Sequence, residues 1–523
     1  MPRSTAELIV ECLVNEGVTH VFGIPGEENI RLIEALAASP IHYVLTRHEQ
    51  GASFMAETYG RLTGRAGVCS ATLGPGAINL LLGTADATTN STPLIALSAQ
   101  VGMQRSYKES HQSVDLVPMF DPVTKWSALM ATPGAAPEMI RKAFKLAETE
   151  RPGAVYLAVP EDVEEADVPD DLVPLRVNIP RADDPAPGQV ERAAAILREA
   201  RHPILLAGHG AARADAGAAL VRFAEALDIP VATTFHGKGV VPDDHPLALG
   251  AVGFMRHDHV NFGFDRADVI VAVGYELQEF DPVRINPHGD KKIVHIHRFP
   301  AEVDAHYDVA VGLHSDIGRS LDVLADAVGS DSNSTGVGSE RIRELLQGEL
   351  ERGRADDRFP MAPARVVADT REALDRSDIV LVDTGALKMW MARLYPTYEP
   401  NTCLISNGLS TMAWTVPGAI AARIARPESK VLVATGDGAF LMNSQEIETA
   451  LRLGTPMVIL IWVDDAYGLI SWKMDLEIGH NVDTTFGNPD FVAYAESFGA
   501  TGYRITAADE LLPTLRTALA DDT

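Results

Sequence analysis

The chain of 523 residues is long enough for three domains of ordinary size, and its 46% content of hydrophobic residues favours folded structure over disorder. Its formal net charge of −28 argues against sequence-independent binding of nucleic acid, which needs a basic surface. The longest apolar runs, such as Pro456 to Val463, have the length of a strand and are too short for a membrane span.

The N-terminus begins directly with an amphipathic helical pattern and shows no apolar signal-peptide region. The three cysteines, Cys12, Cys69 and Cys403, are scattered and lack Cys-x-x-Cys spacing. Such cysteine usage is typical of a reducing compartment and predicts no disulfides. We therefore expect a cytoplasmic globular protein that binds neither nucleic acid nor a membrane.

The first block, residues 1–165, alternates short β-rich runs with helical stretches. The runs HYVLTR, AGVCSATL and PLIALSAQ predict strands, and GASFMAETYGRLT predicts a helix. This alternation is typical of a parallel sheet covered by helices. A stretch rich in Pro and Asp, from Glu161 to about Pro187, then indicates a linker, and we expect its first acids, Glu161 to Asp171, on a solvent face.

The second block, residues 188–330, alternates the strands HPILLAG, DVIVAVGY and KIVHIH with helices, and the joint GSDSNSTGVGS ends it near Ser339. His295 and His297 lie on one strand face, where we expect packing because no third metal ligand is evident. The third block, residues 355–523, contains the buried-strand runs DIVLVDTG, KVLVATGDG and PMVILIWVDD. The fold class that accounts for all three blocks is α/β, with three doubly wound parallel-sheet domains.

Two strands of the third block each end beside an acidic residue. VLVAT precedes Gly436-Asp437-Gly438, and MVILIWV precedes Asp464. Because residues past the carboxyl ends of neighbouring parallel strands lie side by side, we expect Asp437 and Asp464 to be neighbours. Two carboxylates, a carbonyl and phosphate oxygens suit Mg²⁺, and the glycines let backbone N–H groups approach a diphosphate. The alternative is a structural loop, since Gly-Asp-Gly by itself is common.

Here the sequence resembles the thiamine diphosphate-dependent enzymes, whose metal motif is Gly-Asp-Gly followed about 27 residues later (464 − 437 = 27) by Asn-Asn or a variant. The resemblance implies that Asp437 and Asp464 bind Mg²⁺ through their side chains and that Ala466 supplies a carbonyl. Asp464 stands where the family usually has Asn, a change also found in FAD-independent acetolactate synthases. The first block would then bind the pyrimidine of thiamine diphosphate, and the third its diphosphate.

The first block supplies the other half of the resemblance, in TRHEQGASFMAETYGRLTGRAGVCSATLGPGAINL. The family places a glutamate here, Glu49, which hydrogen-bonds N1′ of the aminopyrimidine and stabilises the imino tautomer that removes the proton from thiazolium C2. The cofactor then carries the carbanion chemistry. Taken alone, Glu49 would be a solvated acid at a helix start, and Met412, which matches the residue that bends the cofactor, would be a core residue.

The resemblance assigns further residues to the cofactor and the substrate. The expected cofactor-binding residues are Glu49, Gly385, Ser410, Met412, Gly436, Asp437, Gly438, Ala439, Asp464, Tyr467, Gly468 and Leu469. The expected substrate-pocket residues are Gly26, Leu73, Gly74, His111, Gln112, Trp472 and Lys473. Gln112 joins Glu49 as a catalytic residue, because it faces the substrate in FAD-independent acetolactate synthases. A polar loop pair, His111-Gln112, is the alternative.

Several stretches are most similar to the FAD-independent acetolactate synthases, among them VFGIPGEENI and SHQSVDLVPMFDPVTKWSAL. GYELQEFDP replaces the turn found in FAD-dependent relatives, so we expect no functional flavin. The implied activity is that of a transferase that decarboxylates pyruvate or a related 2-oxo acid and joins the two-carbon unit to a second 2-oxo acid, giving 2-acetolactate. The resemblance also implies at least a homodimer, and commonly a homotetramer, because Glu49 and the metal motif around one cofactor come from different subunits.

Some positions depart from the family pattern. Lys473 replaces a glutamine near the substrate, and either favours an acidic or longer acceptor or is solvated. Polar side chains are missing at Ala386-Leu387, where backbone contacts or Lys388 would compensate, and Trp414 reshapes the cleft. The relatives continue past the end of this chain with a strand and an arm, so the sequence is either truncated or lacks that arm.

Three alternatives remain open. The first is another thiamine diphosphate-dependent reaction, such as simple decarboxylation or ligation to an aldehyde. The second is a non-catalytic relative that binds cofactor, which the intact Glu49, Asp437 and Asp464 oppose. The third, a nicotinamide-dependent dehydrogenase, lacks a G-x-G-x-x-G opening after the first strand.

Overall fold

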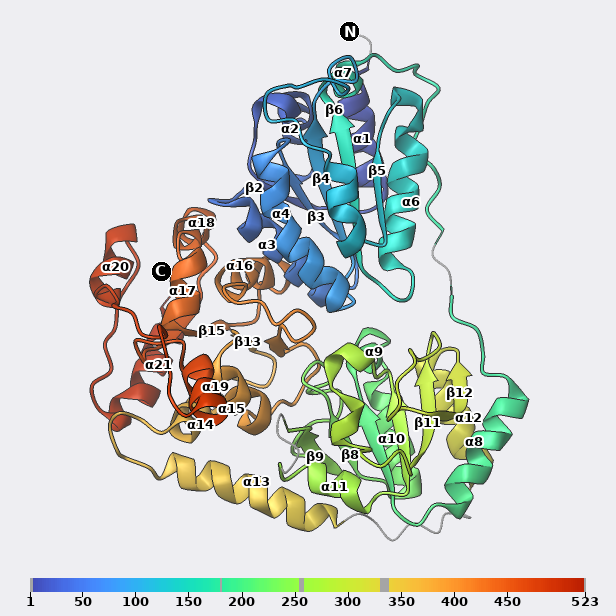
Figure 1. Cartoon of the computed structure of the whole chain (residues 1–523), viewed down its shortest axis with the longest axis vertical. Coiled ribbons are helices and arrows are strands. Elements are labelled where there is room, and N and C mark those ends of the chain that lie inside the picture. The colour runs from blue at the N-terminus through green and yellow to red at the C-terminus, as the bar shows by residue number, and fades with distance from the viewer. Residues whose placement is uncertain (1–2, 179–180, 254–257, 330–337, 522–523) are drawn as a thin grey trace.

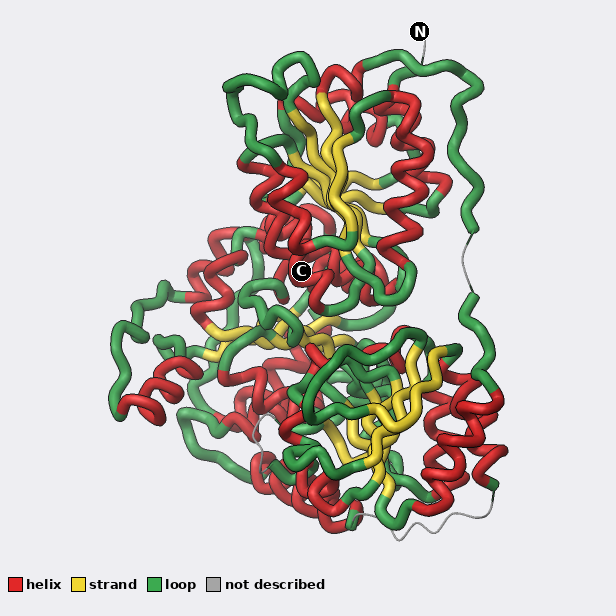
Figure 2. The backbone as a smooth tube through the Cα atoms, turned by 45° about the vertical axis from the view of Figure 1, so that its right-hand side comes forward, coloured by secondary structure: helices red, strands yellow, loops and turns green. Residues whose placement is uncertain are grey.

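The computed structural model describes residues 3–178, 181–253, 258–329 and 338–521. They form three sheets in which every strand pair is parallel, with helices packed against both faces of each sheet (Figure 1; Figure 2). The predicted doubly wound α/β fold is therefore confirmed. Within these residues no helix is both long and apolar enough to cross a membrane.

The first domain lies at the top of Figure 1 and contains a six-stranded sheet in the order β2-β1-β3-β4-β6-β5. Its strands are β1 (His20–Gly23), β2 (His42–Leu45), β3 (Gly67–Ala71), β4 (Leu94–Gln100), β5 (Trp126–Leu129) and β6 (Ala154–Pro160). Its main helices are α1 (Thr5–Asn15), α2 (Ile30–Ala37) and α6 (Ala136–Glu148) on one face, and α3 (Glu49–Thr63), α4 (Pro75–Thr89) and α5 (Leu116–Phe120) on the other. β3, β4 and β6 are wholly buried, which is why they are nearly continuous apolar runs.

The predicted linker begins inside the first domain. Its first residues form α7 (Glu161–Glu165), which buries Val163 and Glu164. The Glu164 carboxylate accepts the backbone N–H of Leu32 at 2.5 Å, and burial raises its pKa to about 7. The expectation that these acids face solvent was therefore wrong for Glu164. Its carboxylate is buried because it accepts a backbone N–H in the first turn of α2.

The middle domain has the sheet order β12-β11-β10-β7-β8-β9. Its strands are β7 (Pro203–Ala207), β8 (Val231–Thr233), β9 (Ala248–Ala251), β10 (Val269–Val273), β11 (Lys292–His297) and β12 (Val309–His314). Its helices are α8 (Pro187–Glu199), α9 (His209–Arg213), α10 (Gly217–Leu227), α11 (Asn261–Arg266) and α12 (Ile317–Val328). On β11 the rings of His295 and His297 are stacked 5.7 Å apart, which confirms their shared face. Most of the predicted joint before Ser339 lies outside the described residues.

The third domain has the sheet order β14-β13-β15-β16. Its strands are β13 (Ile379–Val382), β14 (Cys403–Ile405), β15 (Val431–Gly436) and β16 (Val458–Trp462). Its helices are α14 (Pro363–Ala373), α15 (Ala386–Leu394), α16 (Thr415–Ala425), α17 (Asp437–Asn443), α18 (Glu446–Leu453), α19 (Gly468–Ile478), α20 (Phe491–Phe498) and α21 (Leu511–Ala520). The long helix α13 (Ser339–Arg354) precedes this domain and also packs on the middle one (Figure 1).

The first and third domains of the chain pack through α3 and α16, which lie against each other in Figure 1. A Cβ on Gly418 of α16 would lie 2.7 Å from the Thr58 hydroxyl of α3, so glycine permits this close approach. Arg61, near the end of α3, donates through Nη1 to the carbonyl of Ile405 at 2.8 Å. These contacts set the position of α3, and therefore of Glu49 at its start.

Candidate active site

Asp437 and Asp464 lie side by side at the carboxyl ends of β15 and β16. Asp437 is almost fully buried, and its Oδ2 accepts the backbone N–H groups of Asp464 at 3.2 Å and Asp465 at 2.8 Å. The side-chain amide of Asn488 donates to the same oxygen at 2.8 Å. Partial burial and the charge of Asp437 raise the pKa of Asp464. The two carboxylates therefore repel each other, and a bound cation would relieve that repulsion.

The surroundings of this pair fit a cation held with a diphosphate. Among the described residues no group of three or more His, Cys, Asp and Glu is placed to hold a metal. A cation at Asp437 would therefore need other oxygens, and carbonyl and phosphate oxygens are suitable ligands for Mg²⁺. The neighbouring glycines have no room for side chains, since a Cβ on Gly468 would lie 2.4 Å from Asp464 Oδ2 and one on Gly438 would lie 2.8 Å from Tyr467.

Asp383 holds the segment around Met412 next to the end of strand β13. The sequence pattern did not single out this residue. Asp383 follows β13 and is fully buried. Its Oδ1 accepts the N–H groups of Thr384 at 2.8 Å and Ala413 at 3.0 Å, and its Oδ2 accepts the Thr415 hydroxyl at 2.5 Å. Ser410 and Ala413 on either side of Met412 have φ of 55° and 69°. This strained loop is held in shape by the Asp383 carboxylate.

Gly385 and Lys388 belong to the segment that follows β13, Gly385 as the N-cap of α15 and Lys388 in its first turn. Cβ atoms added to Gly385 and Gly436 would lie 3.8 and 3.5 Å from the Leu387 side chain, so the ends of β13 and β15 meet there. Lys388 is buried, and its Nζ donates to the Ser406 carbonyl at 3.2 Å and the Ser410 hydroxyl at 3.0 Å. Burial lowers its pKa to about 8. In this structure Lys388 supports the Ser410 loop.

Glu49 is the first residue of α3 and faces α4. Its Oε2 accepts the side-chain amide of Asn79 at 3.0 Å. A Cβ on Gly76 would lie 3.2 Å from Oε1, so the backbone of α4 passes close to this carboxylate. The Glu49 carboxylate thus contacts α4 of its own domain, with one oxygen bonded to Asn79 and the other close to Gly76.

The expected substrate residues fall into two groups. In the first domain, a Cβ on Gly74 would lie 2.4 Å from the Gln112 carbonyl, and one on Gly26 would lie 2.3 Å from Thr72. Leu73 is buried between these contacts, whereas His111 is exposed and Gln112 has a φ of 56°. In the third domain, Trp472 and Lys473 are exposed on α19, which has no buried residue.

The remaining expected cofactor residues, Ala439, Tyr467 and Leu469, belong to the two segments that follow β15 and β16. Ala439 is buried in α17, and Tyr467 packs on Phe486 with ring centroids 5.0 Å apart. Among the described residues, the hydrogen-bond partners of the Asp437 carboxylate all come from the third domain. The partner of the Glu49 carboxylate, Asn79, comes from the first domain. The chain therefore builds two separate groups of polar residues, one in its first domain and one in its third.

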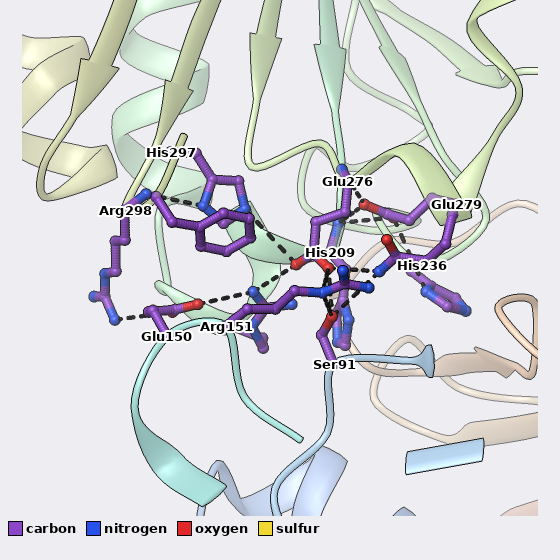
Figure 3. Close-up of polar contacts among 12 residues, drawn as sticks. Ser91, Glu150, Arg151, His209, His236, Glu276, Glu279, His297 and Arg298 are labelled. Carbon is purple, nitrogen blue, oxygen red and sulfur yellow. Dashed lines mark hydrogen bonds and ion pairs between the residues drawn. The ribbon is translucent and has the colours of Figure 1, made fainter. Parts of the chain in front are cut away.

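The crevice of the middle domain is occupied by its own side chains (Figure 3). It lies between β7 and β10, where the strand order reverses and doubly wound domains bind nucleotides. Glu279 accepts the N–H of His209 at 2.9 Å and the Thr234 hydroxyl at 2.6 Å there. A Cβ on Gly208 would lie 2.6 Å from Glu279 Oε1, so the carboxylate is in close contact with the backbone. Burial and the charge of Glu276 raise the pKa of Glu279 to about 7.

Glu276 next to this crevice joins the first and middle domains. Its carboxylate lies 2.6 Å from Nη2 of Arg213 and 3.0 Å from Nε of Arg151, which comes from the first domain (Figure 3). The hydroxyl of Ser91, also from the first domain, donates to the same carboxylate. Sequence reasoning missed this contact, because only the fold brings the strand end of one domain to the loops of another.

Comparison with known proteins gives matches along the whole chain. The family descriptions that match are "Thiamine pyrophosphate enzyme, N-terminal TPP binding domain" at residues 3–119, the central domain at 190–324 and the C-terminal TPP binding domain at 383–523. A Methanocaldococcus jannaschii protein named "Probable acetolactate synthase large subunit" is 36% identical over 536 residues, covering 98% of this chain and 89% of that protein.

Two further relatives agree with these matches. "Acetolactate synthase" of Bacillus subtilis is 35% identical over 520 residues, covering 98% of this chain and 90% of its own. "Acetolactate synthase, catabolic" of Raoultella terrigena is 34% identical, covering 99% and 93%. The chain belongs to the thiamine pyrophosphate enzymes, and within them to the family of acetolactate synthase large subunits.

Proposed function

We propose that the protein is a thiamine diphosphate-dependent carboligase that decarboxylates pyruvate, or a related 2-oxo acid, and joins the two-carbon unit to a second 2-oxo acid to give 2-acetolactate. The observation that carries the proposal is the pair Asp437 and Asp464, adjacent at two strand ends in the domain that matches a TPP-binding family. The similarity to acetolactate synthases over nearly the full length supports the reaction type.

In this proposal each half-site has its own task. The cofactor, when bound, would supply the electron sink that lets CO₂ leave and lets the two-carbon unit add to a second carbonyl. Asp437, Asp464 and the Ala466 carbonyl would hold Mg²⁺, and the backbone beside Gly436 and Gly438 would hold the diphosphate.

The remaining roles concern the reacting end of the site. Glu49 would hold a proton at N1′ of the aminopyrimidine, and Met412 would support the bent cofactor. Gln112 would face the substrate with Gly26, Leu73 and Gly74, while Trp472 and Lys473 would approach from α19. Backbone contacts at the Gly385 and Ser410 loops support this arrangement, because Asp383 and Lys388 hold both loops in place.

We propose that the enzyme works without a flavin. The crevice of the middle domain supports this, because Glu279 already bonds to the backbone N–H of His209 where a nucleotide phosphate would need donors. Ser91 and Arg151 also reach the neighbouring Glu276 from the first domain. A flavin would have to displace both sets of contacts.

We propose that the functional unit is at least a homodimer, and a homotetramer in its full form, in which Glu49 of one subunit meets the metal motif of another. A band of exposed hydrophobic side chains beside the metal motif supports a subunit contact. These residues are Val463, Tyr467, Ile470, Trp472, Leu476, Ile478 and Val482.

Two coarser features complete the proposal. Domain boundaries at 1–165, 188–330 and 355–523 are supported by the three separate sheets. A cytoplasmic location is supported by three cysteines that are all free and buried.

The test is product analysis with pyruvate, thiamine diphosphate and Mg²⁺, followed through CO₂ and through acetoin formed from acetolactate after acid treatment. The proposal expects acetolactate that depends on both additions. Aldehyde or acetoin formed directly, without acetolactate, would favour the simpler decarboxylases. Asp437→Ala serves as the control and should give no acetolactate. The acceptor specificity is tested with Lys473→Gln, which should lose any preference for an acidic second 2-oxo acid.

A further inference from the structure

The turn that presents Glu49 is held by a glutamate from the third domain of the same chain. Between β2 and α3 the chain passes through Arg47 and His48, whose backbone N–H groups precede the helix. Glu446, the first residue of α18, accepts the N–H of Arg47 at 3.0 Å and that of His48 at 3.1 Å through Oε1. A side chain almost 400 residues away (446 − 48 = 398) therefore satisfies the two donors immediately before Glu49.

The contact is enclosed and shaped for this carboxylate. Glu446 is fully buried, and its Oε2 accepts the Thr449 hydroxyl at 2.6 Å. A Cβ on Gly51 would lie only 2.7 Å from Glu446 Oε1, so a glycine in the first turn of α3 leaves room for it. Near the other end of α18, Arg452 donates to the Leu45 carbonyl at 2.5 Å, so both ends of α18 contact the segment that leads into α3.

Further hydrogen bonds within the turn fix the backbone on both sides of Glu49. His48 is the N-cap of α3, and its Nδ1 accepts the N–H of Gln50 at 3.1 Å. The Thr46 hydroxyl donates to the His48 carbonyl at 3.1 Å. Glu49 is the next residue, so the peptide plane of His48 determines where its Cα and side chain begin. A carboxylate that reaches a reacting group must be held to within a fraction of an ångström, because a 1 Å displacement can cost about 100-fold in rate.

We propose that Glu446 is a positioning residue for Glu49, through which the third domain fixes the orientation of the catalytic glutamate of the same chain. This inference rests on the proposed function for the role of Glu49. Glu446 itself touches neither substrate nor cofactor. It acts through the two backbone N–H groups that it accepts. Gly51 contributes to the same contact by leaving room for the Glu446 carboxylate.

The experiment compares Glu446→Ala, which removes both acceptors, with Glu446→Gln, which keeps an uncharged oxygen for the two N–H groups. The matched control is Asp268→Ala in the middle domain. Asp268 accepts the N–H groups of Arg201 at 2.8 Å and His202 at 2.9 Å, so its loss frees two consecutive amides far from Glu49. If Glu446→Ala does not fold, Gly51→Ala provides the perturbation, because its methyl group must displace the carboxylate.

Two readouts separate positioning from general stability. The first is amide hydrogen exchange of the peptide 46–50 in the protein without cofactor, which needs no catalysis. The second is the rate of hydrogen exchange at C2 of added thiamine diphosphate, which reports the Glu49 function without a 2-oxo acid. Steady-state kcat and KM for pyruvate complete the set.

The inference expects faster amide exchange at 46–50 in Glu446→Ala and a fall of about 10- to 100-fold in C2 exchange and kcat, with KM little changed. Glu446→Gln should stay close to wild type, and Asp268→Ala should lose stability without slowing C2 exchange. Wild-type C2 exchange in Glu446→Ala or Gly51→Ala would overturn the inference, as would an equal loss in Asp268→Ala. A wild-type protein with no C2 exchange would instead overturn the proposed function, and the amide exchange would still show whether Glu446 holds the turn.

Discussion

Replacing Asp383 with alanine should loosen the cofactor loop of the third domain and weaken cofactor binding. The carboxylate is fully buried at the carboxyl end of β13 and accepts the backbone N–H groups of Thr384 and Ala413. The hydroxyls of Thr415 and Thr435 also donate to it, at 2.5 and 3.1 Å. Hydroxyls can rotate to new acceptors, but the two backbone donors cannot.

The cost of this change follows from those two donors. A buried donor that loses its partner costs about 1 to 3 kcal/mol, so Asp383→Ala should destabilise the protein by about 2 to 6 kcal/mol. Asp383→Asn keeps an oxygen for both N–H groups and should cost clearly less. Because Ala413 follows Met412 directly, the alanine variant should also bind thiamine diphosphate more weakly.

The assay is urea unfolding of the cofactor-free protein together with titration of thiamine diphosphate by tryptophan fluorescence. The matched control is Asp378→Ala at the opposite end of β13. Asp378 is buried and accepts the N–H groups of Asp375 at 2.8 Å and Lys430 at 2.9 Å. The Asp378→Ala variant should therefore lose about as much stability as Asp383→Ala, but its affinity for thiamine diphosphate should be unchanged. Equal cofactor affinity in Asp383→Ala and wild type would refute the reasoning, as would equal losses in Asp383→Asn and Asp383→Ala.

Three further predictions test other parts of the account. Glu49→Gln should lower kcat by about 100- to 10,000-fold while thiamine diphosphate still binds, and near-normal turnover would remove its assigned role. Asp464→Ala should raise the Mg²⁺ concentration for half-maximal activity by at least about tenfold, with Asp464→Asn close to wild type, as measured by Mg²⁺ titration of activity. Burial raises the pKa of Glu164 from 4.5 to about 7, so its contribution to stability is lost as pH rises through that range. Glu164→Gln should therefore be more stable than wild type by about 3 kcal/mol at about pH 8 and lose this advantage near pH 4, as read from unfolding midpoints.

The sheets could be predicted because their strands are continuous apolar runs, and β15 is an example that is buried almost throughout. β16 is an equally apolar run and pairs with β15, but its residues are only half-buried, so the expectation of a buried strand was wrong there. The adjacency of Asp437 and Asp464 could be predicted for the same reason, since each follows the end of one of these strands. The sequence pattern therefore predicted those contacts at the metal motif that follow from the order of the strands.

The supporting carboxylates could not be predicted in this way. Asp383 and Glu446 act by accepting backbone N–H groups from loops, and which loop comes within reach depends on packing between domains. Glu164 lies in an acidic stretch typical of solvent, yet it is buried because α7 packs beside α2. The joining of the first and middle domains at Glu276 is likewise a product of tertiary packing. A signal existed only for Asp383, an acid directly after the strand run DIVLV.

The central claim is tested most directly by the ratio of pyruvate consumed to CO₂ released, measured with carbon-labelled pyruvate in the presence of thiamine diphosphate and Mg²⁺. The account predicts two molecules of pyruvate for each CO₂, with the label from both molecules in 2-acetolactate. One molecule of pyruvate for each CO₂, with the label in acetaldehyde, would contradict the proposed carboligation and leave a simple decarboxylase.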